Sequence, residues 1–301
     1  MTSPIAEHAP VLVDAVLSHS AFKPGDVVLD GTIGLGGHAR AILPRIAPGG
    51  VYIGLDLDAD MLAIARQRTA PFESMMRLKH LNFADFDAAL VEFGLANVDH
   101  MLVDLGLNSA QIEDASRGFS FDRDGPLDMR FDASRGRCAL DLVNGLSENE
   151  LSDILYEYGQ EDLSRKIARR ICQVRRASRI QSTHVLAQAV ESAVRTSGRA
   201  PRGRIHPATR VFQALRIAVN DELGNLERFL SKSAAHLRVG GSLSVISFHS
   251  LEDAIVKRFL RAGKASGAFD ELTRRPIVAD EAERESNPRS RSAKLRVGRK
   301  L

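Results

Sequence analysis

Short apolar runs alternate with segments of helical period over the first 104 residues. The runs that indicate buried strands are 27–29, 51–55, 78–83 and 101–103. The segments whose apolar positions recur at helical spacing are 10–21, 38–43 and 59–68. Asp58 precedes the third of these helices and is suited to cap it. Continuous apolar strands separated by helices are typical of a parallel sheet covered on both faces, so this part predicts an α/β fold.

The pattern changes after Asp104. Residues 105–137 are rich in Gly, Asp, Ser and Arg and show no clear period, so we expect a loop there. A capping box at Ser147 and Glu150 then opens the first of three expected helices, which are 148–158, 162–177 and 183–197. An all-helical insertion over 109–215 follows from this pattern, and His206 with Pro207 is expected to mark the return to the α/β core.

The α/β pattern resumes toward the end of the chain. We expect one long amphipathic helix through 211–230, ended by the glycines at 240–241. The elements expected after it are a strand at 243–246, a helix at 251–260, an irregular region at 263–287 and a final strand at 294–297. The predicted organisation is therefore a discontinuous α/β domain, 1–108 and 216–301, that carries the helical insertion.

Charge is distributed unevenly along the chain. The 301 residues contain 41 Lys and Arg against 38 Asp and Glu, a net charge of +3. Residues 160–210 carry a local +9 and residues 284–301 a local +6, which leaves −12 for the other 232 residues. An acidic body with two basic segments indicates a polyanionic partner, although arginine-rich helices are also common as solvated faces.

Compartment and membrane association follow from simpler features. Only two cysteines occur, which argues against a disulfide framework and for a reducing compartment. The first eight residues lack the basic start and apolar stretch of a secretory signal. No apolar run approaches the roughly 18 residues of a membrane span. We expect a cytoplasmic protein without membrane contact, and the sequence leaves the oligomeric state open, a homodimer included.

The glycine-rich loop between the first strand and helix is the clearest candidate for ligand binding. Its glycines would let a ligand approach the backbone, and the following helix N-terminus offers N–H donors. Gly34, Gly36 and Ala39 satisfy the dinucleotide fingerprint, and Asp56 lies 20 residues past Gly36, where it suits a ribose diol. These features fit both an NAD-dependent oxidoreductase and an S-adenosylmethionine (SAM) methyltransferase.

Three details favour SAM. Asp30 precedes the glycines, where a carboxylate suits an ammonium group and would repel a pyrophosphate. Asn82 and Phe83 follow the third strand and offer adenine a polar group and an apolar face. Asp104 ends the fourth strand, where a methyl acceptor would sit, and the insertion begins directly after it. We therefore expect the helical domain over the reaction centre.

Long motifs then show a family resemblance. Those that carry it are Asp30-Gly-Thr with Gly36-Gly-His38, Asp104-Leu-Gly, the stretch from Arg117 to Arg130, His206-Pro-Ala-Thr-Arg210, Ser247-Phe-His-Ser-Leu-Glu-Asp253 and Asn287-Pro-Arg-Ser-Arg291. In this order, from about His8 to Arg296, they resemble the bacterial 16S ribosomal RNA cytosine-N4 methyltransferases. The resemblance implies a Rossmann-like class I methyltransferase sheet and a cytosine substrate in the decoding (P-site) region of the small ribosomal subunit.

The resemblance also implies a set of SAM-binding residues. These are Gly36, Gly37, His38, Asp56, Phe83, Asp104 and Gln111. One departure from the family pattern is Asn108, which stands where the family often has a small hydroxyl.

The reaction itself depends on positioning. An exocyclic cytosine amine is a poor nucleophile, so it must be aimed at the sulfonium methyl and hydrogen-bonded by acceptors. The candidate acceptors are the Asp104 carboxylate, the Asn108 side-chain oxygen and carbonyls near Gly106. Our hypothesis is that Asp104 mainly orients SAM while Asn108 and Ser109 face the base. A purely RNA-binding module would leave Asp30, Asp56 and Asp104 without a purpose.

Contacts to RNA leave more alternatives. Phe119 and Phe121 suit either base stacking or core packing. The arginines of the same stretch (Arg117, Arg123, Arg130) suit either phosphates or salt bridges within the loop. Better phosphate candidates are the helix at 165–179, the basic loop at 199–204 and the tail from Arg289. No metal is expected, because neither a cysteine pair nor a His-x-x-x-His spacing occurs, and His249 is expected to hold its loop by hydrogen bonds.

Overall fold

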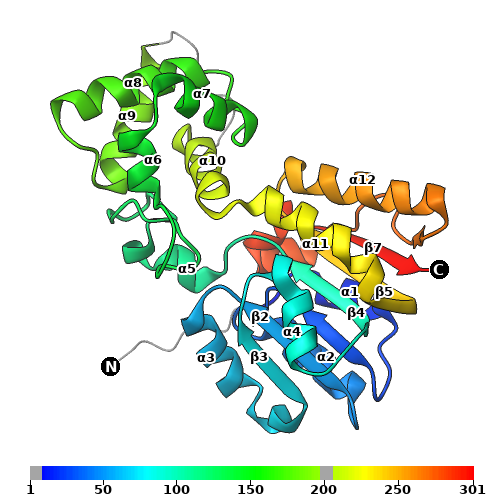
Figure 1. The fold of residues 1–301 in the computed structure, drawn as a ribbon. Helices are drawn as coiled ribbons and strands as arrows, with labels where there is room; N and C mark the ends of the chain where they lie inside the picture. The colour runs from blue at the N-terminus through cyan, green and yellow to red at the C-terminus, as the bar shows by residue number, and fades with distance from the viewer. Residues whose placement is uncertain (1–8, 197–205) are drawn as a thin grey trace. The chain divides into compact units, whose positions relative to one another are not determined.

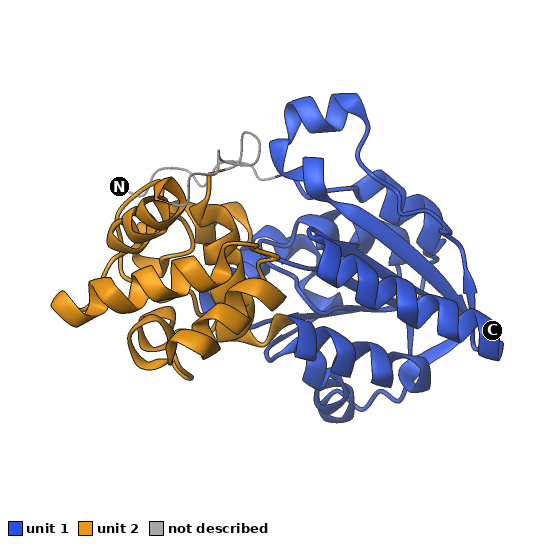
Figure 2. Ribbon diagram, turned by 90° about the horizontal axis from the view of Figure 1, so that it is seen from above, with its two compact units in different colours: residues 1–106, 223–301 blue, residues 107–222 orange. Residues whose placement is uncertain are grey.

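The computed structural model describes residues 9–196 and 206–301, which form two compact units (Figures 1 and 2). Unit 1 consists of Met1–Gly106 and Leu223–Leu301, and unit 2 is Leu107–Glu222. Unit 2 contains the whole of the expected insertion and extends seven residues further toward the C-terminus. Among the described residues, no helix is long and apolar enough to cross a membrane.

A seven-stranded sheet forms the centre of unit 1. The strands, in chain order, are β1 (Val27–Asp30), β2 (Val51–Asp56), β3 (Met76–His80), β4 (Val98–Asp104), β5 (Leu237–Ser247), β6 (Phe269–Glu271) and β7 (Lys294–Lys300). Their spatial order is β3-β2-β1-β4-β5-β7-β6. The first five are parallel, and β7 runs antiparallel between β5 and β6. The predicted α/β fold with a parallel sheet is confirmed.

Helices cover both faces of this sheet (Figure 1). Successive side chains of a strand point to opposite faces, so Leu29 joins one apolar cluster and Val28 the other. The helices that pack with Val28 are α1 (Val13–Ser20), α2 (Gly37–Ile46) and α3 (Ala59–Arg68). Those that pack with Leu29 are α4 (Phe86–Glu92), α11 (Glu222–His236) and α12 (Ser250–Ser266). Unit 1 is thus a three-layer α/β/α arrangement.

Several expected boundaries in unit 1 were wrong. The third strand ends at His80 rather than at residue 83, because the Asn82 side chain accepts from Ala84 N and starts a 3-10 helix, Phe83–Asp85. The glycines at 240–241 lie inside β5, and α11 already ends at His236. The region 263–287, expected to be irregular, contains β6 and helix α13 (Glu281–Ser286).

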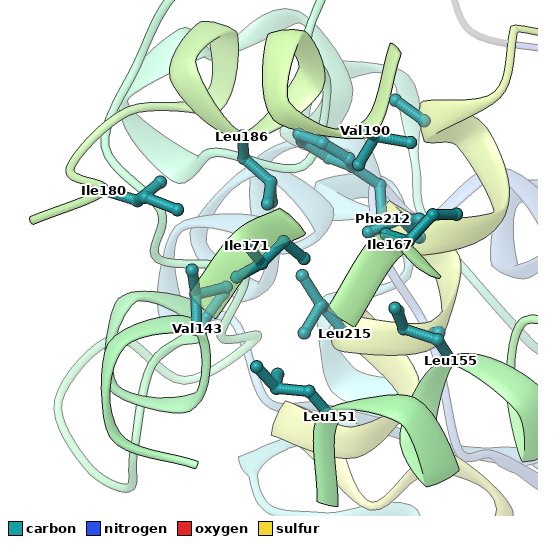
Figure 3. Packing of buried hydrophobic residues seen from close by; sticks show 14 of the residues in the cluster. Val143, Leu151, Leu155, Ile167, Ile171, Ile180, Leu186, Val190, Phe212 and Leu215 are labelled. Atoms are coloured by element: carbon teal, nitrogen blue, oxygen red, sulfur yellow. The ribbon is translucent and has the colours of Figure 1, made fainter. Parts of the chain in front are cut away.

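Unit 2 is helical and has its own apolar core (Figure 3). Its helices are α5 (Ser109–Glu113), α6 (Ala139–Gly145), α7 (Glu148–Glu157), α8 (Ser164–Ala177), α9 (Thr183–Arg195) and α10 (Ala208–Asn220). The capping box of Ser147 and Glu150 opens α7 as expected. Helices α5 and α6 were missed, because each is too short to show a clear period. The core side chains from four helices include Leu151, Ile167, Leu186 and Phe212.

The expected long helix through 211–230 is two helices. Asp221 has a left-handed backbone (φ 49°) and ends α10. The Asn220 side chain donates to Met129 O and accepts from Phe131 N, which ties the end of α10 to its own unit. The chain therefore returns to unit 1 near residue 222, and not at His206 as expected, because α10 supplies Phe212 to the core of unit 2.

Candidate functional site at the carboxyl end of the parallel strands

Three aspartates stand at the ends of neighbouring parallel strands. Asp30 ends β1, Asp56 ends β2 and Asp104 ends β4, and β1 lies between the other two strands. Carboxyl ends of parallel strands meet at one edge of the sheet, where open α/β sheets bind ligands. The structure therefore brings together these three predicted residues.

Asp30 is almost completely buried, with 2% of its surface exposed. Its Oδ2 accepts from the Tyr52 hydroxyl at 2.7 Å, and its Oδ1 accepts from Thr32 N at 3.1 Å. Burial raises the pKa of Asp30 from 3.8 to about 7, against the lowering effect of these two hydrogen bonds. Sequence reasoning missed Tyr52 as the partner of this candidate site residue, since a tyrosine inside an apolar strand is typical of a core position.

Asp56 holds the glycine-rich loop. Its Oδ2 accepts from Gly34 N at 2.8 Å and its Oδ1 from Asp58 N at 2.9 Å. Burial raises the pKa of Asp56 to about 6, so the carboxylate is mostly ionised at neutral pH. Each carboxylate oxygen can accept more than one hydrogen bond, so Asp56 retains acceptor capacity for a ribose hydroxyl.

The loop continues into the N-terminus of α2. Gly36 precedes the helix with a left-handed backbone (φ 77°), a conformation that favours glycine, and no side chain caps the helix there. Gly37 packs so tightly that an added Cβ would lie 2.9 Å from Pro10 Cβ. Helix N-termini suit carboxylate and phosphate groups, and α2 carries no acidic residue in its first turn.

Asp104 presents an unsatisfied buried oxygen. Its Oδ1 is inaccessible to solvent and has no hydrogen-bond partner among the residues at 9–196 and 206–301. Its Oδ2 lies 3.8 Å from His38 Nδ1, while His38 Nε2 donates to Val11 O at 3.0 Å. Burial raises the pKa of Asp104 well above 3.8, and the charges of Asp30 and Glu252 add to the effect. Such an orphaned acceptor suits a ligand that brings its own N–H or O–H donors.

Phe83 lies behind the loop that follows β1. Its ring contacts Phe229 edge to face, with centroids 5.7 Å apart. Gly31 makes this possible, because a Cβ at residue 31 would lie 2.7 Å from Phe83 Cβ. The neighbouring Asn82 donates to Asn225 Oδ1 while it caps its 3-10 helix, so the site receives Phe83 from a fixed turn.

The loop between β5 and α12 lies beside Asp104, because β5 is the strand paired with β4. Glu252, 2% exposed, accepts from Phe248 N at 2.8 Å, and its charge acts on Asp104. His249 is the N-cap of α12 in a capping box with Glu252, as expected for a residue that holds its loop. Glu252 itself was missed as a site residue, although it lies within one of the motifs that carry the family resemblance.

The family follows from a comparison of the whole chain. The model of the MraW methylase family matches residues 5–301. This chain belongs to the MraW methylase family. The similar curated relatives are named ribosomal RNA small subunit methyltransferase H. That of Syntrophotalea carbinolica is 47% identical over 100% of both chains, and that of Geotalea uraniireducens is 44% identical over 98% of both chains.

Membership in the methylase family confirms the predicted enzyme class, a SAM-dependent methyltransferase, and its cofactor. The NAD-dependent alternative is thereby rejected. The residues of unit 1 fit the groups of SAM. Asp104 Oδ1, which has no hydrogen-bond partner among the described residues, suits the ammonium group, and the Asp56 carboxylate suits the ribose. The uncapped N-terminus of α2 suits the carboxylate.

Three predicted site residues of this methylase belong to unit 2. Asn108 is the N-cap of α5, where its Oδ1 accepts from Gln111 N at 3.0 Å and its own N–H donates to Gln111 Oε1 at 3.2 Å. Ser109 is the first residue of that helix. Asn and Ser are both strong N-cap residues, so Asn108 can replace the family's small hydroxyl without loss of the cap. The roles of these residues toward SAM or the base stay predictions.

The aromatic residues of the long motif are in the core of unit 2. Phe119 is 8% exposed and stacks on Phe131, with centroids 5.7 Å apart. Phe121 is partly buried and contacts Phe212 edge to face and the His206 ring at 4.7 Å. Of the two alternatives, base stacking and core packing, the structure shows core packing for Phe119.

The arginines of the same motif make contacts within their own loop. Arg130 forms a salt bridge with Asp128 at 2.7 Å. Arg117 donates to the carbonyls of Arg130 and Phe131 at 3.0 and 2.9 Å, and Arg123 donates to a carbonyl of α5. These contacts favour the structural alternative over phosphate binding for Arg117 and Arg130.

The three basic segments that were expected to bind phosphate differ in what the structure shows of their arginines. Helix α8 carries the expected arginines, of which Arg165, Arg169 and Arg176 are exposed. The loop at 199–204 lies outside the described residues. In the tail, Arg296 of β7 is 3% exposed and donates to Asp253 Oδ1 at 2.6 Å, whereas Arg291 and Arg299 are exposed. Arg296 is thus a poor phosphate candidate.

Proposed function

We propose that this methylase transfers the methyl group of SAM to N4 of a cytosine in the decoding region of 16S rRNA, free or within the small ribosomal subunit. The observation that carries the proposal is the buried Asp104 Oδ1, which lacks a partner among the described residues at the end of β4. The names of the curated relatives, which specify small-subunit ribosomal RNA, support the substrate class.

Bound SAM supplies an electrophilic methyl group on a sulfonium. We assign the ribose diol to the Asp56 carboxylate, whose oxygens still have lone pairs beyond those used by Gly34 and Asp58. The α2 N-terminus, preceded by Gly36, suits the amino-acid carboxylate. Asp30 and Asp104 suit the ammonium group, and Phe83 offers a face to adenine.

The protein contributes mainly position and hydrogen-bond acceptors. In this proposal Asp104 orients SAM. Its Oδ1 can alternatively accept a hydrogen bond from the cytosine amine. Asn108 and Ser109, at the start of α5, face the base in this proposal. Accurate aim of a weak nucleophile at the methyl group can supply several kcal/mol of the acceleration, since well-oriented groups reach large effective molarities.

Unit 2 is the proposed substrate-recognition domain. Helix α8 presents arginines on its exposed side, and its apolar side, with Ile167 and Ile171, packs in the core. A rigid core beneath a basic face is suited to hold RNA by its phosphates. Such contacts would make RNA binding strongly dependent on salt concentration.

The experiment combines cofactor binding with methyl transfer. S-adenosylhomocysteine binding is measured by calorimetry for the wild type, Asp104→Ala and the exposed-carboxyl control Asp14→Asn. Transfer is measured with radiolabelled SAM on naked 16S rRNA and on assembled small subunits, and the product nucleoside is identified by mass spectrometry. We expect N4-methylcytidine from the wild type and loss of cofactor binding only in Asp104→Ala.

Two outcomes would contradict the assignments. Normal cofactor binding with lost turnover in Asp104→Ala would make Asp104 an acceptor for the base rather than an orienting group. Methylation of a different nucleoside, or of neither RNA substrate, would overturn the proposed reaction.

A further inference from the structure

Unit 2 contains a pocket of about 570 Å³ that the site in unit 1 does not use. It lies between α6 and the end of α8, and its lining residues are Arg137, Asp141, Asn144, Gly145, Arg175 and Arg179. Its volume lies within the range of about 300–1,000 Å³ typical of ligand sites. None of these six residues is aliphatic or aromatic and three are arginines, so the pocket suits an anionic ligand rather than an apolar ring.

Arg175 is held in place by the end of α6. Its Nη1 donates to Val143 O at 2.7 Å and its Nη2 donates to Leu146 O at 2.5 Å. These carbonyls belong to the C-terminal turn, where a cation is favoured by the helix dipole. A guanidinium has five N–H donors, so three remain for a ligand after these two contacts.

The other two arginines flank this fixed group. Arg179 precedes Ile180, whose N–H donates to Asn144 Oδ1 at 3.0 Å and whose carbonyl accepts from Asn144 Nδ2 at 2.8 Å. Arg137 lies over Gly145, where an added Cβ would be 3.7 Å from Arg137 Nη2. Both arginines are exposed, and neither forms a hydrogen bond or ion pair within the described parts of the chain.

The charge of the pocket is only partly balanced. Asp141 is the single acidic residue in the lining, and its Oδ2 accepts from Cys138 N and Cys138 Sγ. These hydrogen bonds lower the pKa of Asp141, and the charges of Arg137 and Arg179 lower it further, which indicates that both guanidinium groups act on this carboxylate. Three positive charges face one negative charge, so the lining carries a net +2.

We propose that this pocket binds a phosphodiester group of the RNA substrate, an inference that rests on the proposed function in RNA methylation. Arginine matches phosphate geometry with paired N–H donors, and the fixed Arg175 would orient the group. The net positive charge of the lining argues that an anionic phosphate group of the backbone, rather than a neutral base, is held here. Arg137 and Arg179 then close on the remaining phosphate oxygens.

The test compares arginines of the pocket with an exposed arginine of unit 1 that the proposal gives no role in RNA binding. Arg137→Gln, Arg179→Gln and the double variant remove pocket charges, whereas Arg45→Gln removes an exposed charge in the last turn of α2. Binding of fluorescently labelled 16S rRNA is measured by anisotropy from about 50 to 200 mM salt, with S-adenosylhomocysteine binding as the control for intact unit 1.

We expect the double variant to bind RNA about tenfold more weakly, with a reduced salt dependence. For each phosphate that the protein no longer neutralises, the slope of log K against log salt should become shallower by about 0.7–0.9. Arg45→Gln should change affinity much less, and cofactor binding should stay unchanged in all variants. An equal decrease in Arg45→Gln would show a general charge effect and overturn the pocket assignment.

A second pair of variants tests the pocket without removing an arginine. Gly145→Glu and Gly145→Gln add side chains of equal size, and only the first adds a negative charge among the guanidinium groups. RNA affinity should fall clearly more in Gly145→Glu. Equal effects, or inorganic phosphate that binds without competing with RNA, would overturn the assignment to an RNA phosphate.

Failure of this inference is distinguishable from failure of the proposed function. If the wild type transfers methyl groups to 16S rRNA and the pocket variants match Arg45→Gln, only the pocket assignment is wrong. If the wild type transfers no methyl group to RNA, the proposed function is wrong as well.

Discussion

Replacement of Asp30 by asparagine is expected to stabilise unit 1 at neutral pH. Asp30 is buried at the end of β1, where it accepts from the Tyr52 hydroxyl and Thr32 N and forms no ion pair with any described residue. Burial, opposed by these hydrogen bonds and reinforced by Asp56, raises the pKa of Asp30 to about 7. An asparagine keeps a side-chain acceptor and removes the charge.

The magnitude follows from the two pKa values. A carboxyl with a pKa of 3.8 in the unfolded chain and about 7 in the folded chain binds its proton more tightly when folded. Between these values the free energy of unfolding falls as pH rises, at up to about 1.4 kcal/mol per pH unit. Below pH 3.8 the ionisation of Asp30 does not change the free energy of unfolding, and above pH 7 it lowers that free energy by about 4 kcal/mol.

Scanning calorimetry from about pH 3 to about pH 8.5 tests this reasoning, because that range spans both pKa values. The stability advantage of Asp30→Asn should be small at the acid end, grow through pH 7 and then level off. Asp14→Asn, which removes an exposed carboxyl in the first turn of α1, controls for the removal of one negative charge. A stability difference that does not depend on pH, or a variant less stable than the wild type at the alkaline end, would refute the argument.

Three further substitutions test individual contacts by urea unfolding. Gly31→Ala places a Cβ 2.7 Å from Phe83 Cβ, and the overpacking should cost about 1–3 kcal/mol. Asn108→Ser should preserve the α5 cap, whereas Asn108→Ala should cost about 1 kcal/mol, and equal stability of both would contradict the capping role. Asp253→Asn leaves Arg296, 3% exposed, without its carboxylate and should cost about 3 kcal/mol, an effect that Asp14→Asn should not reproduce.

The position of the candidate cofactor site was predictable because its three aspartates stand at ends of apolar strands. Asp30, Asp56 and Asp104 each follow a continuous apolar run, and parallel strands bring such ends to one edge without any knowledge of long-range contacts. The partner of Asp30 was not predictable in this way. Tyr52 lies inside β2, and only the pairing of β2 with β1 places its hydroxyl on that carboxyl.

The end of the insertion was mispredicted because the apolar period continues across it. Phe212 in α10 packs in unit 2, and Leu226 in α11 packs on the sheet of unit 1, yet both fit one helical spacing. The break is a single left-handed residue, Asp221, which is itself neither glycine nor proline. The local sequence pattern therefore identified the apolar faces of both helices. It did not show that the two faces pack into different cores.

The positive charge that remains available for RNA differs from the count along the sequence, because some side chains make contacts within the fold. Residues 284–301 carry a local +6, but Arg296 is bound to Asp253, and Lys300 Nζ donates to the carbonyls of Ala234 and Leu237. These side chains hold β7 in the sheet and are engaged before any RNA arrives. Among the described residues, neither Arg165 and Arg176 of α8 nor the flanking arginines of the pocket form such contacts, whereas Arg169 of α8 pairs with Glu148 at 3.2 Å. Phosphate binding should therefore depend more on unit 2 than the sequence charge of the tail suggests.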